Sequence, residues 1–414
     1  MNCCIIRRAA DVDLNGVSGR AFAAIPGTGL VTSAASLFLT QVMNNYTGIS
    51  SVGPGSVALE TDVIRWAGRL MGLPDGSAGT ITSGGSTSIL SAIVVARTKL
   101  LGQDFARGVV YCTPQTDFAL HKALQIAGFP SDAIRYIRVD GDLCMCEEDL
   151  VKAIQKDQAE GHIPFCIAAN AGTTSFGTVD RIDLLAEIAK ANGLWLHVDA
   201  AYGGFFQLTD RGKQRFQGIE NADSIVLDTH KSLFLPNSSS ILLVRDGKDL
   251  DEGFGIPSAP YLKHTRHALP GGESLLSFAN LSIELTRPAR GIAVWFPLHC
   301  HGLEAFRTAL DEKLDLTQHL WEELKNMDGI EVAPAPHLSV LAFRVNFQND
   351  VEADNRMTKI LVERVNSDRD LLISTTSNDE KIYARIAIMS ARTTGAIANE
   401  LLTKIRQSLS KLLE

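Results

Sequence analysis

Short apolar runs that alternate with helical patterns constrain the fold of this 414-residue chain more than any other feature. Several runs are continuous and rich in β-branched residues, which is typical of strands covered on both faces of a sheet. The segments between them show helical periodicity and begin or end at Ser, Asp, Asn or Gly. The expected strands are 108–112, 164–170, 194–200, 224–228 and 240–246, and the expected helices include 86–101, 118–127, 147–159 and 182–192. This alternation predicts an α/β fold.

From about residue 307 the pattern changes to longer amphipathic helices and fewer strands. The expected elements there are a helix at 309–327, a strand at 338–345, a helix at 351–366, a strand at 383–389 and a closing helix at 394–413. This mixture predicts a smaller α+β domain. We therefore expect an N-terminal arm (1–50), a large domain (51–306) and a small C-terminal domain (307–414).

Charge and cysteine content exclude several classes of partner. The formal net charge is −8 and the basic residues are scattered, so no surface for nucleic acid or an anionic membrane is indicated. No apolar run approaches the ~20 residues of a membrane span. The seven cysteines are odd in number and sit in no metal-binding spacing, which fits a reducing compartment. We expect a cytoplasmic protein that binds a small molecule, without a metal, nucleic-acid or membrane partner.

Lys231 follows an apolar strand in the segment SIVLDTHKSLFLP (224–236) and stands beside His230. A lysine at a strand end is usually a surface residue, but apolar flanks on both sides favour partial burial here. Partial burial lowers the pKa of a lysine, and a neutral amine can form an imine with an aldehyde cofactor. We therefore expect Lys231 to have a lowered pKa and to bind such a cofactor.

Asp199 ends another apolar strand, in LWLHVDAAYGGFF (194–206). A carboxylate there is costly unless it has a partner. The protonated pyridine nitrogen of pyridoxal 5′-phosphate (PLP) is one such partner, and a turn-capping role for Asp199 is the structural alternative. Ala201 is small enough to lie against a cofactor ring, and His197 lies on the same side of the strand as Asp199.

A turn rich in glycine and hydroxyl groups opens the helix in GTITSGGSTSILSAIVVARTKL (79–100). Its backbone N–H groups, together with Ser86 and Thr87, can bind a phosphate group. The same composition also occurs where Ser and Gly simply cap a helix. The turn precedes the Asp199 and Lys231 segments in the chain, and this order favours the phosphate-binding interpretation.

With these segments in view, the sequence resembles the group II pyridoxal-dependent amino-acid decarboxylases, which have PLP fold type I. The matching segments are 51–74, TSGGSTSIL (82–90), NAGTTSFGTVDRID (170–183), HVDAAYGG (197–204), DTHK (228–231) and ELTRPARGIAVW (284–295). The resemblance implies a large domain with a mostly parallel seven-stranded sheet, PLP as the cofactor, and α-decarboxylation of an L-amino acid to an amine. It also implies a homodimer with the active site at the interface.

The resemblance assigns residues to the ring side of the cofactor. It implies that Lys231 forms the Schiff base with PLP and that Asp199 pairs with the pyridine nitrogen. Ala201 would contact the ring, and Thr174 would lie near the ring and the 3-hydroxyl group.

On the phosphate side, the resemblance implies contacts from Gly85, Ser86, Asp228 and His230, next to Thr87 in the same turn. His230 and Lys231 are also the candidates for proton transfer during the reaction.

Two positions depart from the family pattern and leave alternatives open. Asp117 occupies the place of a histidine that stacks on the ring; it could receive a cationic substrate group, Phe118 or His121 could take the ring face, or activity could be lost. Phe278 aligns with a tyrosine of a mobile loop, and phenylalanine there resembles related aldehyde synthases. Aldehyde formation, carbon–carbon lysis and a non-catalytic binding protein are therefore the alternatives to amine formation.

Val57 aligns with a polar residue that lines the family's substrate pocket. An apolar residue there predicts a less polar substrate side chain.

Overall fold

The computed structural model describes residues 18–255, 277–347 and 350–413. Its main element is a seven-stranded sheet with the strand order β1-β7-β6-β5-β4-β2-β3. Strands β2 to β6 pair in parallel, and β7 runs antiparallel between β6 and β1. The strands are β1 (Ala78–Thr82), β2 (Gly108–Cys112), β3 (Ile134–Tyr136), β4 (Ile163–Asn170), β5 (Trp195–Asp199), β6 (Ser224–Asp228) and β7 (Ser240–Val244). The predicted α/β class with a mostly parallel sheet of seven strands is confirmed.

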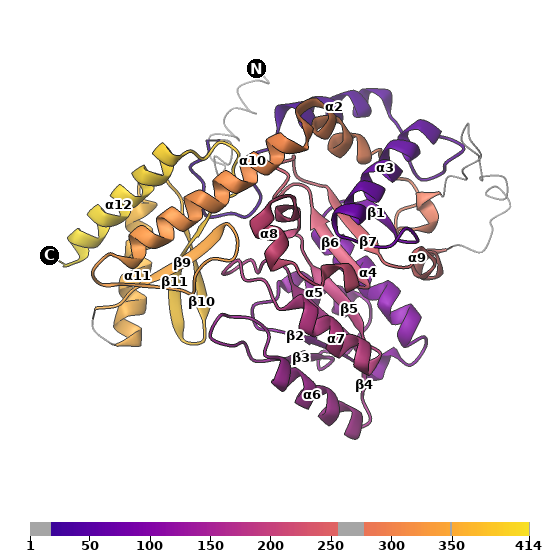
Figure 1. The fold of residues 1–414 in the computed structure, drawn as a ribbon, viewed down its shortest axis with the longest axis horizontal. Helices are drawn as coiled ribbons and strands as arrows, with labels where there is room; N and C mark the ends of the chain where they lie inside the picture. Colours follow the sequence, from indigo (N-terminus) through magenta and orange to yellow (C-terminus); the bar gives the residue numbers. More distant parts are fainter. Residues whose placement is uncertain (1–17, 256–276, 348–349, 414) are drawn as a thin grey trace, which may run out of the picture.

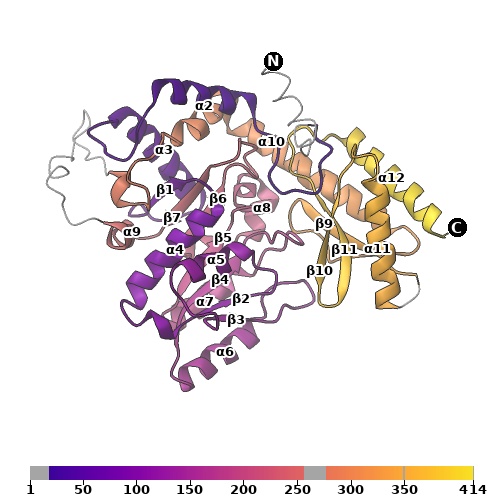
Figure 2. The same ribbon diagram turned by 180° about the vertical axis from the view of Figure 1, so that it is seen from behind.

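Helices cover both faces of this sheet, which explains why its strands are continuous apolar runs. Figure 1 shows α7 and α8 in front of the sheet, and Figure 2, seen from behind, shows α4 and α5 in front. Strands β2, β6 and β7 are buried along their whole length. The helices of this part are α4 (Gly85–Leu100), α5 (Phe118–Ile126), α6 (Glu147–Ala159), α7 (Ile182–Asn192), α8 (Asp210–Arg215) and α9 (Gly247–Phe254).

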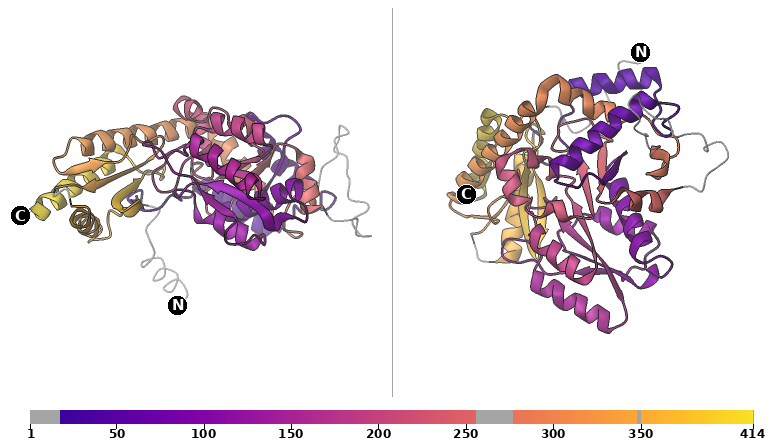
Figure 3. Two further views of the ribbon diagram at one scale, coloured as in Figure 1. Left: turned by 90° about the horizontal axis from the view of Figure 1, so that it is seen from below. Right: turned by 45° about the vertical axis from the view of Figure 1, so that its right-hand side comes forward.

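A second sheet of four antiparallel strands lies to one side of the first (Figure 3). Its order is β10-β11-β9-β8, from β8 (Ile330–Val332), β9 (Val340–Val345), β10 (Ser374–Asn378) and β11 (Lys381–Ala387). The helices α11 (Val351–Val365) and α12 (Gly395–Leu413) share its separate apolar core, which includes Phe343, Leu361 and Leu401. This confirms the smaller α+β part that the sequence predicts, and the structure adds that its strands are antiparallel.

One long helix, α10 (Gly291–Lys325), runs from the large part into the small part (Figure 1). Gly302 interrupts it with φ 73° and ψ 160°, a left-handed conformation that glycine adopts without steric cost. The predicted helix 309–327 therefore corresponds to the portion after this kink. The predicted boundary between residues 306 and 307 falls inside α10 and stays a prediction.

Helices α2 (Val31–Met43) and α3 (Pro54–Leu70) pack beside the first half of α10. Before them, residue Ala21 forms a parallel bridge with Leu372 of the small part. The first 17 residues of the predicted arm lie outside the described residues. None of the helices within the described ranges combines the length and apolar content that crossing a membrane requires.

Candidate active site

A cavity of about 470 Å³ lies where three neighbouring parallel strands end. Asn170, Asp199 and Asp228 are the last residues of β4, β5 and β6, and Asn170 is paired in register with Asp199. The carboxyl ends of parallel strands meet at one edge of a sheet, which is where ligands bind in open α/β folds.

The cavity brings together all the residues that the sequence predicts to bind the cofactor. Its lining consists of Ser83, Gly84, Gly85, Ser86, Thr87, Ile89, Asp117, Ala119, Asn170, Gly172, Thr173, Thr174, Asp199, Ala201, Tyr202, Asp228, His230, Lys231, Asn237 and Ser238.

Lys231 lies in the turn after β6, and its side chain is only 19% exposed. Its Nζ is 3.1 Å from Oδ2 of Asp228. Burial lowers the pKa of Lys231, but the negative charges of Asp228 and Asp199 outweigh burial, so the net shift of the pKa is upward. The predicted lowering of this pKa is therefore wrong for the protein without cofactor, because tertiary structure places carboxylates around the amine.

Asp199 is held in a fixed orientation, because its Oδ1 accepts a hydrogen bond of 3.1 Å from the backbone N–H of Ala201. Burial raises the pKa of Asp199 to about 6, and the charge of Lys231 opposes this rise. A buried carboxyl group with a raised pKa is stabilised as an anion when a cation comes beside it. Asp199 is thus suited to pair with a positively charged ligand group.

His197, two residues earlier on β5, lies within 2.9 Å of Ser224 Oγ through its Nδ1. Burial lowers its pKa to about 4, so the imidazole is neutral at physiological pH.

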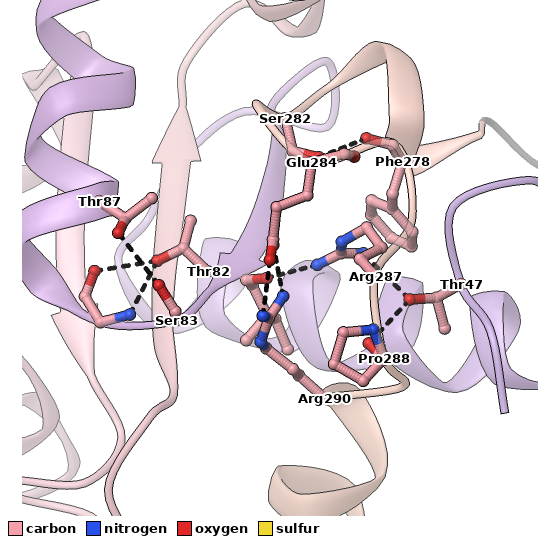
Figure 4. A network of polar contacts seen from close by, with 12 residues as sticks. Thr47, Thr82, Ser83, Thr87, Phe278, Ser282, Glu284, Arg287, Pro288 and Arg290 are labelled. Carbon is pink, nitrogen blue, oxygen red and sulfur yellow. Dashed lines mark hydrogen bonds and ion pairs between the residues drawn. The ribbon is translucent and has the colours of Figure 1, made fainter. Parts of the chain in front are cut away.

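The start of helix α4 forms one wall of the cavity. No side chain caps this helix at its N-cap residue Gly84, so backbone N–H groups of its first turn remain available to an anion. A Cβ at Gly85 would lie 2.8 Å from Oδ2 of Asp228, so a larger residue there would displace this carboxylate group. Ser83 and Thr87 are joined by a hydrogen bond of 3.1 Å between their hydroxyl groups (Figure 4).

His230 and Asp228 lie beside this turn. The Nδ1 of His230 is 2.9 Å from the carbonyl oxygen of Ser239, to which it donates, and its Nε2 is 3.7 Å from Oδ2 of Asp228. Oδ1 of Asp228 is buried and has no hydrogen-bond partner among the described residues. This orphaned acceptor indicates that the site is completed by a further donor.

Asp117 caps the N-terminus of α5, where its Oδ1 accepts 2.9 Å from the N–H of Ala119. Its Oδ2 accepts a hydrogen bond of 3.1 Å from the hydroxyl group of Thr174. The carbonyl oxygen of Thr174 in turn accepts 2.7 Å from Nε of Arg385, a residue of the small sheet. The small part of the protein therefore holds the wall of the cavity that carries Asp117.

The alternatives for the ring face are not supported by geometry. Phe118 is 84% exposed, and neither Phe118 nor His121 lines the cavity. Both line a separate cavity of about 510 Å³, where Nε2 of His121 is 2.6 Å from the hydroxyl group of Tyr136. The α5 backbone turns these two side chains away from the strand ends, so Asp117 alone of the three faces them.

Two further predicted positions lie outside the cavity. Phe278 is buried and does not line the cavity. Cζ of Arg287 lies over its ring, 4.8 Å from the ring centre. Val57 is fully buried in the core on helix α3, which packs against β1 and β7. The interpretations of Phe278 as the loop residue and of Val57 as a pocket residue are therefore wrong for this chain as described.

The sequence interpretation missed several lining residues: Ser83, Asn170, Tyr202, Asn237 and Ser238. Asn170 could have been found, because a polar residue ends the apolar run of β4 as Asp199 ends that of β5. Asn237 and Ser238 carry no such signal; they reach the cavity through a turn in which Ser238 has φ 81°.

One cluster of possible metal ligands lies away from the cavity, formed by Asp157, Glu160 and His162. Asp157 is already engaged by Arg135 at 2.8 Å and by the hydroxyl group of Tyr111 at 2.9 Å. No metal is assigned to it.

Comparison with known proteins agrees with this geometry. Residues 16–373 match the family model described as the pyridoxal-dependent decarboxylase conserved domain. The chain belongs to this family.

Relatives in the pyridoxal-dependent decarboxylase family carry several activities. The chain is 32% identical to the aromatic-L-amino-acid decarboxylase of Bacillus atrophaeus, across 92% of this chain and 79% of the relative. It is 30% identical to the L-2,4-diaminobutyrate decarboxylase of Rhizobium meliloti, across 87% and 71%. A crystal structure of Oryza sativa TDC with PLP and tryptamine superposes with a TM-score of 0.92 at 22% identity, covering 99% of this chain and 88% of the other.

The chain is therefore a PLP-dependent amino-acid decarboxylase of fold type I. The residues of the cavity fit the cofactor, since they offer a primary amine, a buried carboxyl group that favours a cationic partner, and an uncapped helix start for a phosphate group.

Proposed function

We propose that the cavity at the strand ends is the active site, in which Lys231 holds PLP while the α-carboxylate of an L-amino acid is removed to leave an amine. The observation that carries this proposal is the position of Lys231 and Asp199 in one cavity. When bound, the cofactor supplies an electron sink for the electrons left on Cα as carbon dioxide departs.

Each predicted residue has a role that its position supports. Asp199 keeps the pyridine nitrogen protonated, because a buried anion and a cation stabilise each other. Ala201 and Thr174 hold the ring, and Lys231 and His230 carry protons to and from Cα. The first turn of α4, with Gly85, Ser86 and Thr87, binds the phosphate group, and His230 and Asp228 close this end of the cavity.

Asp117 selects the charge of the substrate. Among the described residues its hydrogen-bond donors, Thr174 and Ala119, are both neutral, so no cation in direct contact compensates its charge. Asp228 is paired with Lys231, and Asp199 pairs with the cofactor. A substrate side chain with a positive charge gains from the free charge of Asp117, and one with a negative charge is repelled.

Carbon dioxide release from a panel of amino acids tests this function. We expect amine and carbon dioxide from substrates with cationic or neutral side chains. Glutamate and aspartate should react with a kcat/KM at least about tenfold lower, which corresponds to one like-charge contact of about 1.4 kcal/mol. Ammonia, peroxide and an aldehyde in place of the amine would contradict the proposed reaction.

Asp117→Asn, which removes the charge but keeps the size of the side chain, should reduce this discrimination between cationic and anionic substrates. Asp132→Asn is a matched control, because Asp132 is exposed and does not line the cavity. An unchanged ratio in Asp117→Asn would remove Asp117 from the proposed selection.

The active enzyme is proposed to be a homodimer, and helix α2 supports this. Its buried residues are the polar Ser33, Ser36 and Thr40, whereas most of its large apolar residues are exposed. The exposed residues are Val31, Phe38, Leu39, Val42 and Met43, which recur at the spacing of one helix face. An apolar helix face that one chain leaves uncovered is typical of a surface that a second copy covers.

Phe38→Glu combined with Val42→Glu should convert the dimer to a monomer in light scattering, because two buried charges oppose the contact. Leu184→Glu on α7 is the control, since Leu184 is an exposed apolar residue on a different helix. A monomeric wild-type protein would contradict the proposed homodimer.

A cytoplasmic location is also proposed. The five cysteines within the described residues are all free, which suits a reducing compartment.

A further inference from the structure

A fully buried ion pair lies behind the phosphate-binding turn. Glu60 of α3 and Arg287, in the segment before α10, are both 0% exposed, and their charged groups are 2.6 Å apart. Figure 4 shows Arg287 beside the ring of Phe278, with a dashed line to Thr47. The Nη1 of Arg287 donates 3.3 Å to the hydroxyl oxygen of Thr47.

The pair also binds the backbone of strand β1. The N–H of Ile81 donates to Oε1 of Glu60 at 3.3 Å, and Nη2 of Arg287 donates to the carbonyl oxygen of Ile81. Within the described residues, strand β1 is at the edge of the sheet and pairs only with β7. The two side chains thus take the place of a neighbouring strand, with Glu60 as the acceptor and Arg287 as the donor.

Ile81 is one residue from the end of β1, and the phosphate-binding turn follows directly. Thr82 continues the connection, because its Oγ1 donates 3.0 Å to the carbonyl oxygen of Gly84 and lies 2.7 Å from Oγ of Ser88. Oγ of Ser88 also donates 2.9 Å to Oγ of Ser240 on β7. A shift of Ile81 is therefore transmitted to the first turn of α4.

The pair is poorly explained by stability alone. Oε2 of Glu60 and Nε of Arg287 are buried without a hydrogen-bond partner in the described part of the chain. Burying two charges costs free energy that their attraction returns only with full hydrogen bonding. The start of α10 packs tightly against the backbone of α3 at Glu60, since a Cβ on Gly291 would lie 2.6 Å from Cα of Glu60.

We propose that the Glu60–Arg287 pair positions the phosphate-binding turn, and so sets the affinity of the enzyme for the phosphate group of its cofactor without touching it. This inference rests on the proposed role of the α4 turn. Glu60 and Arg287 are positioning residues. They fix the position of the backbone at the end of β1, and hence the direction of the N–H groups in the turn that leads into α4.

The test compares PLP with pyridoxal, which lacks the phosphate group, by spectroscopic titration of the apoprotein. In Glu60→Gln and Arg287→Lys we expect the dissociation constant of PLP to rise about tenfold, because misaligned hydrogen bonds to a charged group are weaker. The dissociation constant of pyridoxal should stay within about twofold of the wild-type value. Hydrogen exchange of the backbone amides of residues 81–88 should become faster in both variants.

Glu284→Gln is the matched control. Glu284 accepts two hydrogen bonds from Arg290, at 2.6 and 2.9 Å, and the substitution weakens this ion pair. The pair lies in the same segment as Arg287 but, among the described residues, has no hydrogen bond to β1. Its affinity for PLP should equal that of the wild type.

Equal losses for PLP and pyridoxal would show a general effect on stability and would overturn the inference, as would an unchanged affinity for PLP. If Arg287→Lys does not fold, Glu60→Gln decides the question. A wild-type protein that binds PLP no better than pyridoxal would instead refute the phosphate-binding turn itself, and the positioning role with it.

Discussion

Lys231→Ala is expected to abolish amine formation, lowering kcat by at least about 10³-fold, the scale on which the loss of a catalytic nucleophile acts. The same change should remove the visible absorption band of the covalently held cofactor, since Lys231 is the lysine that lines the cavity. Absorption spectra and carbon dioxide release of the purified protein measure both effects.

Lys231→Arg separates the amine from its charge. In the wild type, Oδ2 of Asp228 lies 3.1 Å from Nζ of Lys231, and arginine would keep a cation there. Its guanidinium group stays protonated and does not form an imine with the cofactor. We therefore expect the arginine variant to lose the band and the activity as completely as the alanine variant does. A band that persists in either variant would show that another amine holds the cofactor.

The sequence predicts the buried strands and amphipathic helices of the fold well, because buried positions require apolar residues at the spacing of a strand or a helix. The predicted bounds of β2, β6, α6 and α7 agree with the structure. Strand β10 was not predicted, since its sequence, STTSN, is polar and partly exposed and is stabilised only by pairing with β11. The kink of α10 at Gly302 was not predicted either, because a single glycine inside a helical pattern does not by itself indicate a kink.

The site shows the same division. Asp199 and Lys231 could be recognised because each is a charged residue placed beside a buried strand. The direction of the pKa shift of Lys231 was harder to predict. Asp228 is only three residues away in the sequence, but Asp199 and Asp117 belong to other segments, which the fold brings to the same edge of the sheet. The assignment of Phe278 depended on counting residues across a loop, and such a count does not show which way a side chain points.

Asp199→Asn is expected to lower kcat by about 10³-fold, because asparagine cannot keep the pyridine nitrogen protonated and the electron sink is lost. PLP should still bind, since the lysine and the phosphate-binding turn remain. Steady-state rates and the spectrum of the reconstituted variant measure the two effects separately. A variant with kcat near the wild-type value would show that Asp199 only caps its turn.

The pH dependence of stability gives the same variant a second, independent signature. In the apoprotein, burial raises the pKa of Asp199 to about 6, above its ordinary value near 3.8. The folded state therefore holds this proton more tightly than the unfolded state does, and Asp199 makes the apoprotein less stable as the pH rises from about 4 through 6. Asparagine carries no such cost, so apo Asp199→Asn should gain stability relative to the wild type between pH 4.5 and 7.5.

With PLP bound, the Asp199 anion gains a cationic partner, so at pH 7.5 the wild type should be the more stable of the two proteins. Thermal unfolding of both proteins, with and without PLP, measures this crossing, and the same order in both states would mean that Asp199 does not pair with the cofactor.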